Sequence, residues 1–315
     1  MMSTTDPMDL KVKFLSLSSG SSGNCYFIGR FNGECCIGGI MIDAGVSLKR
    51  LKNILFDNGL STDNIGAVLV THDHMDHVRS LASYCKKLSK PVWTSDVLAD
   101  AILNHTLKLS DLGATVRKLV AGEWNDVSGF QVRYFIVPHD ATQTIGYAVR
   151  IPLSMMTADA DSTDCGRDSL GGHGTVAENG GFHRFFIMTD AGRVTDEAIE
   201  LARESETVVF ESNYDVDMLM SGSYPHELKM RIMNGHGHLS NDECASALRR
   251  FWHPGLRNVF LCHLSENNNT PRLAYEASSA VIAELSSDFP NAPHGQVKVS
   301  LRPLPRTSSS GLIVL

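Results

Sequence analysis

The sequence predicts an α/β fold in which short buried strands alternate with amphipathic helices. Residues 66–70 form an apolar run that is typical of a buried strand, and Val78, Leu81 and Cys85 recur after it at helical spacing. Between them lies the stretch THDHMDH, residues 71–77, with three histidines and two aspartates in seven positions. Ligands of open α/β sheets bind at the carboxyl ends of strands, so this polar cluster stands where a functional site is expected.

The remaining elements follow from the same periodicities. Ser47 can cap a helix that carries Leu48, Leu51 and Leu55 on one face and ends near Gly59. Further helices are expected at residues 78–88, 96–105, 195–204, 215–221, 225–234, 241–251 and 272–284. Strands are expected at residues 12–17, 25–28, 36–42, 66–70, 91–94, 130–137, 145–151, 184–188, 207–210 and 258–261. The tail at residues 302–310 contains Pro and Ser, which predicts loose packing.

Length and composition indicate an ordinary globular chain. Its 315 residues suffice for one large domain or two, and its 43% hydrophobic and 20% charged residues are typical of soluble folds. Residues 153–183 are rich in Gly, Ser, Thr and Asp, which predicts a flexible surface insertion rather than a domain boundary. We therefore expect residues 1–315 to form a single domain.

Charge and cysteine content bear on the compartment and the partner. The net charge of −7 means that any basic surface for nucleic acid must be local. Seven cysteines with irregular spacing and no CxxC predict no disulfide framework and a reducing compartment. No apolar run approaches the roughly 18 residues that span a bilayer. Residues 1–10 lack the apolar core of a signal peptide, so the expectation is a cytoplasmic protein without membrane contact.

Metal binding explains why polar side chains would gather at the end of a buried strand. In the pattern His-x-His-x-Asp-His, His72 and His74 can point the same way while Asp76 and His77 follow at once, so one loop can serve two neighbouring ions. The two variable positions of the pattern are not expected to be ligands. Other expected strands also end in metal-competent residues, namely Asp43, His139, Asp190 and His263. Side chains delivered to the same edge of a sheet converge on one site.

With these residues the chain resembles the metallo-β-lactamase superfamily over nearly its whole length. The resemblance implies a four-layer αββα sandwich of two mixed β-sheets flanked by helices, with a two-metal site at one edge. It implies that Asp190 bridges two divalent ions, Zn²⁺ or Mn²⁺, and that Asp43 steadies the ligand loop from behind. By position, one ion would be held by His72, His74 and His139, and the other by Asp76, His77 and His263.

Three further stretches narrow the reaction. Two ions about 3.5–4 Å apart can share a hydroxide and polarise a substrate oxygen, which serves to cleave esters, amides or phosphodiesters. The stretches VFESN (209–213), GHLS (237–240) and LCHLS (261–265) resemble ribonuclease Z and its nuclease relatives. This resemblance implies that His238 protonates the leaving oxygen while Glu211 orients its imidazole. With Asp76, these are the expected catalytic residues.

The assignment of His238 has alternatives. His238 could be an ordinary residue in a Gly-rich turn at the start of a helix, and His236, two residues earlier, is a competing candidate for the relay. His226 is expected to lie on the surface.

Five longer stretches resemble a narrower set within the superfamily, the YycJ/WalJ group. They are SLSSGSSGNCYFIG (16–29), TDAG (189–192), FESNYDVDML (210–219), GHLSNDE (237–243) and HLSENNN (263–269). Members of this group are described as 5′-to-3′ exonucleases on double-stranded DNA. The resemblance therefore implies a metal-dependent phosphodiesterase whose partner is duplex DNA. The segments at 31–39 and 153–183 look longer than the group requires.

Polar loops near these motifs offer candidate phosphate contacts, each with a structural alternative. Asn24 and the glycine-rich turn before it could bind a phosphate or could simply form a tight hairpin. Ser265 and Asn268 could hydrogen-bond a phosphate oxygen or stabilise their own loop. Lysines and arginines at positions 86, 87, 90, 229 and 231 are more typical of solvated helix faces than of phosphate contacts.

Two other functions stay open at this point. One is a different hydrolase on the same fold, such as a thioesterase, a lactonase or a β-lactamase. The other is a regulatory protein linked to two-component signalling, in which the metals would serve stability alone. The sequence does not indicate an oligomeric state.

Overall fold

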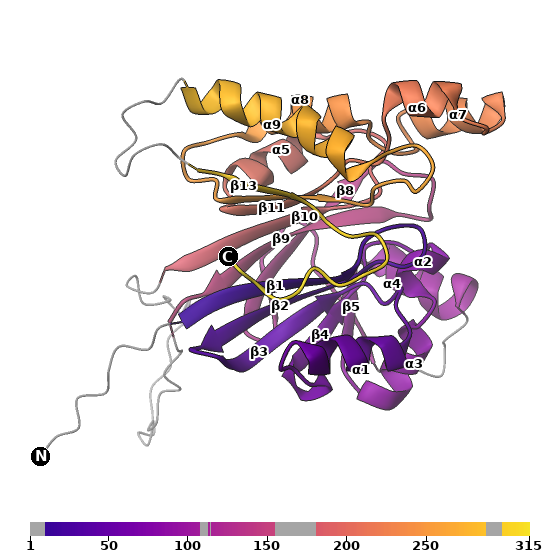
Figure 1. Ribbon diagram of the computed structural model, residues 1–315. Helices are drawn as coiled ribbons and strands as arrows, with labels where there is room; N and C mark the ends of the chain where they lie inside the picture. The colour runs from indigo at the N-terminus through magenta and orange to yellow at the C-terminus, as the bar shows by residue number, and fades with distance from the viewer. Residues whose placement is uncertain (1–9, 108–112, 114, 155–180, 288–297) are drawn as a thin grey trace, which may run out of the picture.

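Two β-sheets lie face to face with helices on both outer sides, which is the four-layer αββα architecture expected from the sequence (Figure 1). The computed structural model describes residues 10–107, 113, 115–154, 181–287 and 298–315. Residues 155–180, the bulk of the expected insertion, lie outside the described residues. The strand order is β14-β1-β2-β3-β4-β5-β6 in the first sheet and β13-β12-β11-β10-β9-β8-β7 in the second.

The bounds of the elements follow the chain through one sheet and then the other. The first sheet contains β1 (Leu10–Ser18), β2 (Cys25–Asn32), β3 (Cys35–Ile42), β4 (Ile65–Leu69), β5 (Val92–Thr94), β6 (Val116–Lys118) and β14 (Ile313–Val314). The second contains β7 (Asn125–Val127), β8 (Phe130–Val137), β9 (Thr144–Pro152), β10 (Phe182–Met188), β11 (Thr207–Glu211), β12 (Asn258–Cys262) and β13 (Ser300–Pro303). In the first half of the chain the helices are α1 (Leu48–Asp57), α2 (Met75–Val78), α3 (Leu81–Leu88) and α4 (Asp96–Asp100), with short turns at Thr62–Asn64 and Ala101–Thr106. In the second half they are α5 (Asp196–Arg203), α6 (Val216–Ser221), α7 (His226–Met233), α8 (Asn241–Phe251) and α9 (Pro271–Ser287).

Buried apolar side chains form three clusters that correspond to the spaces between the layers. The cluster between the sheets joins β1 to β10 through Phe14 and Phe185, whose ring centroids lie 5.6 Å apart. A second cluster packs α5 and α8 on the second sheet, and a third packs α1 and α3 on the first. Leu51 and Leu55 of α1 belong to the third cluster, as their helical spacing predicts.

Parallel pairing brings the ends of several strands to one edge. β3 through β6 are parallel neighbours, and so are β10 through β13. Residues that follow these strands therefore emerge at the same side of their sheet.

Helix caps set the start of two helices beside this edge. Ser47 Oγ accepts a hydrogen bond from Arg50 N at the start of α1. At the start of α8, Ser240 Oγ accepts from Glu243 N at 3.1 Å, and Glu243 Oε2 accepts from Ser240 N at 2.8 Å. This reciprocal capping box fixes the backbone directly after His238.

Local structure differs from the prediction in the first half of the chain. The helix expected at 78–88 is two helices, α2 and α3, because Ser80 N donates to the Ala44 carbonyl at 3.0 Å instead of continuing the helical ladder. Asp76 and His77 consequently lie on α2 rather than on a loop. The helix expected at 96–105 is α4 followed by a π-helical turn, and the short strands β6 and β7 were not predicted.

The prediction of a loosely packed tail was wrong. β13 pairs with β12 and β14 pairs with β1, so the C-terminal segment joins the two sheets. Between them, Leu304 is 2% exposed in the cluster between the sheets, and Ser310 N donates to Ser16 O at 2.9 Å. Pro and Ser are typical of loops, but β13 is an edge strand, where a proline is tolerated because its missing N–H can face away from the neighbouring strand. Within the described ranges, no helix is both long and apolar enough to span a membrane.

Candidate metal centre

Strained strand ends carry the polar residues of the candidate site. Asp43 follows β3, Asp190 follows β10 and His263 follows β12, and their φ angles are 62°, 52° and 53°. A left-handed backbone at a residue other than glycine is strained, and such residues are concentrated at functional sites. The surrounding packing thus holds three polar strand ends in conformations that their residue types disfavour.

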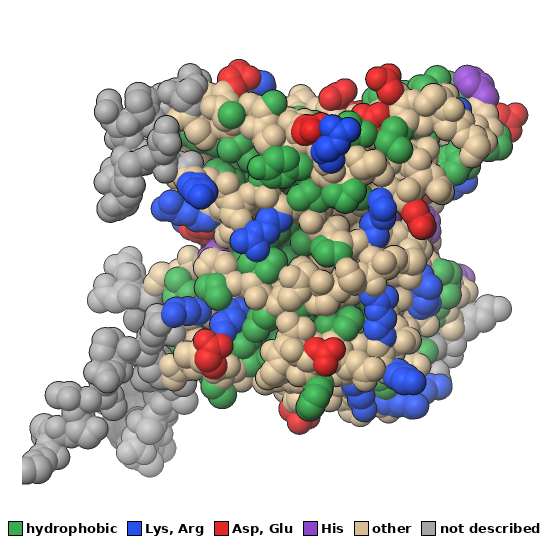
Figure 2. All heavy atoms as spheres, in the orientation of Figure 1, with side chains coloured by type: hydrophobic (Ala, Val, Ile, Leu, Met, Phe, Trp, Pro, Cys, Tyr) green, Lys and Arg blue, Asp and Glu red, His purple; other side chains and the backbone are tan. Residues whose placement is uncertain are grey.

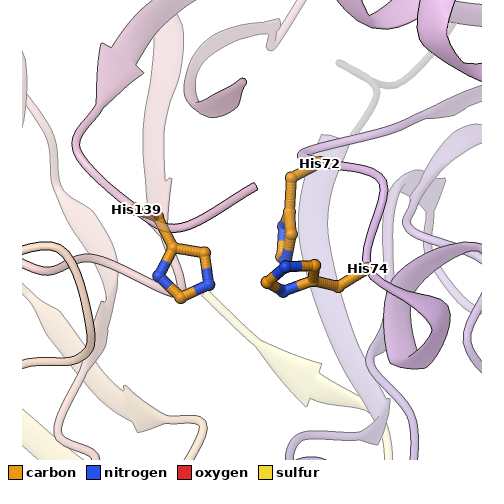
Figure 3. A group of neighbouring side chains, drawn as sticks. All are labelled: His72, His74 and His139. Atoms are coloured by element: carbon orange, nitrogen blue, oxygen red, sulfur yellow. The ribbon is translucent and has the colours of Figure 1, made fainter. Parts of the chain in front are cut away.

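The first ligand group consists of His72, His74 and His139, whose rings converge edge-on (Figure 3). The ring centroids lie 4.8 Å apart for His72 and His74, 5.0 Å for His74 and His139, and 5.4 Å for His72 and His139. Three imidazole nitrogens with an open fourth position are a ligand set that Zn²⁺ uses in catalytic sites.

The second ligand group consists of Asp76, His77, Asp190 and His263. His77 Nε2 lies 3.1 Å from Asp190 Oδ2 and 3.5 Å from Asp76 Oδ2. His263 Nε2 lies 3.7 Å from Asp76 Oδ2. Asp190 Oδ1 is also 4.0 Å from His139 Nε2, so Asp190 stands between the two groups.

Three of these histidines are anchored through Nδ1, which leaves Nε2 toward the site. His77 Nδ1 donates to Asp43 Oδ2 at 2.7 Å, His139 Nδ1 to the Gly237 carbonyl at 2.7 Å and His263 Nδ1 to Glu211 Oε1 at 2.9 Å. Metal-binding histidines are characteristically oriented in this way, because the bond to Nδ1 selects the tautomer and fixes the ring.

Asp43 is hydrogen-bonded, directly or through Thr71, to a histidine of each ligand group. Its carboxylate is fully buried and accepts from Thr71 N at 2.8 Å and from Thr71 Oγ1 at 2.8 Å, besides its bond from His77. Thr71 Oγ1 in turn lies 3.1 Å from His72 Nδ1. One carboxylate therefore contacts a histidine of each group, His77 directly and His72 through Thr71.

The donor atoms fit divalent metal ions. The Nε2 atoms of His72, His139 and His263 are buried and have no hydrogen-bond partner among the described residues. Buried polar atoms in native proteins are nearly always satisfied. A cation bound to each ligand group would satisfy all three nitrogens.

Electrostatics differ sharply between the groups. Burial lowers the pKa of His72 well below its usual value and also lowers the pKa of His139. Burial opposes the charged form of His77 and His263 as well, but neighbouring carboxylates outweigh it, with Asp190 contributing most. The pKa of His77 is raised to about 10, and that of His263 is raised well above its usual value. Burial therefore favours the neutral forms of His72 and His139 in the first group, whereas the second group is a network of ion pairs.

Glu211 joins the second ligand group to His238. Its Oε1 accepts from His238 Nδ1 at 2.8 Å and from His263 Nδ1 at 2.9 Å, and its Oε2 accepts from the backbone N–H groups of Ala191 and Leu239. Burial raises the pKa of Glu211, but the charge of His238 and hydrogen bonds from both imidazoles outweigh it and lower the pKa. The ionised carboxylate orients both rings. His236, the competing candidate, is exposed.

A cavity of about 360 Å³ gives access to this centre. Asp76, His139, Asp190, His238 and His263 line it, together with side chains of α7. The arrangement can therefore present two cations and a histidine to a substrate in one space.

The candidate phosphate contacts separate into two kinds. Asn24 is fully buried, and its Nδ2 lies 3.1 Å from Asp76 Oδ2 and 2.8 Å from His77 Nε2, so it braces ligands and does not face the cavity. Asn24 is buried because its turn packs tightly against α2, where Asn24 N donates to the Asp76 carbonyl at 2.8 Å. Ser265 and Asn268 do line the cavity.

The remaining candidates are also placed. His226 is exposed, as expected. Lys229 is buried, and its Nζ donates to the carbonyls of Met220 and Gly222, so it holds α7 against the end of α6. Arg231, unlike the other basic residues considered from the sequence, lines the cavity.

Sequence reasoning did not assign a role to Asp140, Thr71 or Gly237. Asp140 Oδ1 lies 3.4 Å from His139 Nε2, and its position next to that histidine in the sequence was the available signal. Gly237 is packed so closely that a Cβ atom would lie 2.2 Å from the Ile232 carbonyl oxygen. The same carbonyl accepts from His238 N at 3.0 Å, so a tight turn after α7 positions His238.

Comparisons with known proteins agree with this fold. Residues 39–264 match the family described as "Beta-lactamase superfamily domain". Exodeoxyribonuclease YycJ of Bacillus anthracis is 27% identical over 277 residues, covering 86% of this chain and 89% of its own. Exodeoxyribonuclease WalJ of Streptococcus pneumoniae serotype 2 is 26% identical over 268 residues, covering 85% and 87%. The metallo-β-lactamase fold protein YhfI of Bacillus subtilis superposes with a TM-score of 0.58 at 12% identity, covering 95% of this chain and 98% of its own.

Proposed function

Because this chain belongs to the β-lactamase superfamily, we propose that it is a two-metal phosphodiesterase that removes nucleotides from the 5′ ends of double-stranded DNA. The superfamily match and the exodeoxyribonuclease relatives together support a metal-dependent hydrolase. The observation that carries the step to a phosphodiesterase is Glu211, whose Oε1 contacts His238 and the ligand His263 at once. This contact supports a role for His238 as a proton donor beside the metal ligands.

The residues of the chain divide the chemistry among themselves. Two Zn²⁺ or Mn²⁺ ions held by the two ligand groups would supply Lewis-acid activation of water and of the phosphate oxygens. Glu211 accepts the Nδ1–H of His238, and this bond leaves His238 Nε2 to donate its proton to the oxygen that departs as the P–O bond breaks. Asp43 and Thr71 hold His72 and His77 so that neither ring has to reorganise during the reaction.

The surface is compatible with a nucleic-acid partner despite the net charge of −7. Lys and Arg side chains are spread across the middle of the face shown in Figure 2, where the C-terminal segment passes between the two halves. Arg302 on β13 is exposed there, and Arg306 donates from Nη1 to the carbonyl of the cavity residue Ser265 at 2.9 Å. Cations on a local strip serve phosphate binding even in an acidic protein. The six described cysteines are free, which supports action in a reducing compartment such as the cytoplasm.

End-labelled substrates test the proposal. The full chain, loaded with Mn²⁺ or Zn²⁺, is incubated with duplex DNA, single-stranded DNA and RNA that carry a label at the 5′ end. Release of labelled mononucleotide from duplex DNA at the earliest times is expected, and a 3′ label should remain on shortening fragments. His226→Ala removes an exposed histidine away from the ligands. It is the control for substitutions of the site histidines and should cleave DNA normally. Hydrolysis of a thioester or lactone without cleavage of any nucleic acid would contradict the proposal.

A further inference from the structure

The cavity has a wall that the metal chemistry does not use. Tyr224, Leu228, Arg231 and Ile232 line the same cavity as the ligands and come from α7 and the turn before it. Three of these side chains are largely apolar, and Leu228 is 37% exposed. An exposed apolar surface inside a polar site indicates contact with a part of the substrate other than its phosphate.

Arg231 is the one Lys or Arg among the described residues that line this cavity. Its Nε and Nη2 atoms both donate to Asp140 Oδ2, which occupies two of the five N–H donors of a guanidinium and leaves the others for a ligand. The side chain of Arg231 is 63% exposed, so an anion can reach it.

Asp140 ties this cation to the metal ligands. While its Oδ2 holds Arg231, its Oδ1 lies 3.4 Å from His139 Nε2 and 3.9 Å from His74 Nε2. The Asp140 carboxylate therefore lies between the Arg231 guanidinium and the first ligand group, and contacts both. A planar guanidinium fork held in a fixed orientation matches the geometry of a phosphate.

The wall is fixed to the catalytic segments at three points. Lys229 Nζ donates to the carbonyls of Met220 and Gly222 at 2.7 Å each. Tyr224 Oη accepts from Asn267 Nδ2 at 3.1 Å, in the loop after His263, and His238 N donates to the Ile232 carbonyl at 3.0 Å. A surface that is already rigid loses little entropy when it binds a ligand.

We propose that this wall is a subsite for one nucleotide, in which Arg231 binds the phosphate and Tyr224, Leu228 and Ile232 contact the sugar and base. Nucleobases stack readily on aromatic side chains. The cavity volume of about 360 Å³ is that of a small-ligand pocket rather than of a groove for a long strand. The subsite deepens the proposed function, on which it rests for its DNA substrate, because a pocket for one nucleotide suits removal of terminal residues.

Calorimetric titration with the reaction product tests the subsite without turnover. Protein loaded with Mn²⁺ is titrated with deoxyadenosine 5′-monophosphate and, separately, with inorganic phosphate. Arg231→Ala should weaken the binding of both about tenfold or more, and Arg231→Lys should recover only part of it, because a point charge replaces the fork. Leu228→Ala should weaken the nucleotide but leave inorganic phosphate unchanged.

Arg250→Ala is the matched control, because Arg250 is also an exposed arginine in an ion pair, with Asp196, but does not line this cavity. It should bind both ligands like the wild type, and metal content and melting temperature should be equal in all variants. Equal nucleotide affinity in wild type and Arg231→Ala would overturn the subsite, and so would a wild type that binds no nucleotide. Nucleotide binding that depends on Arg231 in a protein that cleaves no DNA would uphold the subsite and refute the proposed exonuclease.

Discussion

The two ligand groups lie at the same edge of the fold but differ in the charges around their histidines. In the first, His72 and His139 have buried Nε2 atoms without a hydrogen-bond partner in the described part of the chain, and burial lowers both pKa values. In the second, carboxylates surround His77 and His263, and the pKa of His77 is raised to about 10. Burial therefore favours the neutral forms of His72 and His139, whose Nε2 atoms can bind a cation without losing a proton. The second group must release protons before a cation can replace them.

The difference teaches that the placement of carboxylates can give two neighbouring ligand groups at one edge of a fold unlike charges. Asp190 lies 3.1 Å from His77 Nε2 but 4.0 Å from His139 Nε2, so its charge acts mainly on the second group. Each of the following substitutions or conditions should affect the two groups unequally.

Replacing Asp190 by Ala should have the largest effect. Its carboxylate stands between the groups and contacts two histidines of the second one, so the variant should lose the second ion and about 10³-fold or more in activity on DNA. Stepwise DNA digestion and metal analysis measure the loss. Near-normal activity in a folded variant would show that the second group is not part of the reaction.

His238→Ala should reduce kcat by about 10²- to 10⁴-fold while both ions stay bound, because His238 is hydrogen-bonded to Glu211 at 2.8 Å but its Nδ1 lies 4.0 Å from Asp190 Oδ1. A proton donor acts only while it is protonated. The fall in rate toward high pH that reports this donor should therefore disappear. His236→Ala, an exposed histidine two residues away, is the control and should retain full activity. Loss of metal from His238→Ala would instead make it a ligand.

Asp43→Asn should weaken metal binding about 10- to 100-fold with a smaller effect on folding. The amide has one acceptor oxygen where the carboxylate has two. With that oxygen accepting from Thr71 N, the NH2 group faces His77 Nδ1, whereas His72 keeps its contact with Thr71 Oγ1. We therefore expect the second ion to be lost at lower chelator concentration than the first. Simultaneous loss of both ions would show that Asp43 supports the groups equally.

Lowering the pH should have the smallest and most selective effect. In the metal-free protein His77 and His263 have raised pKa values and carry protons at neutral pH, so metal binding there must expel them. Affinity at the second group should fall about tenfold per pH unit for each proton expelled, between pH 8 and 6. The lowered pKa of His72 means that it is already neutral in this range, so the first group should respond less. Metal titrations at three pH values measure the two slopes, and equal slopes would contradict the distinction.

The strand-end pattern was predictable from the sequence because it depends on local order and one general rule. Asp43, His139, Asp190 and His263 each follow an apolar run, and parallel strands deliver their ends to one edge. The contact between Glu211 and His238, 27 residues apart, came from resemblance to known nucleases and not from periodicity. The structure places that pair in hydrogen-bond contact.

Other parts depend on contacts between distant segments, which local patterns do not encode. Arg231 and Asp140 are 91 residues apart, and Ser16 and Ser310 are 294 apart. The Pro- and Ser-containing tail therefore looked loose although it joins both sheets. Asn24 was open to two interpretations, a phosphate contact or part of a tight hairpin, and its burial against Asp76 depends on a segment 52 residues away.

Metal stoichiometry in single-group variants tests the two-group account most directly. Mass-spectrometric metal analysis of the native protein, His72→Ala and His77→Ala is compared at neutral pH. Because the groups share no histidine, the account predicts about two ions in the wild type and about one in each variant, with the ion of the first group retained in His77→Ala. A single ion in the wild type, lost in both variants alike, would contradict it.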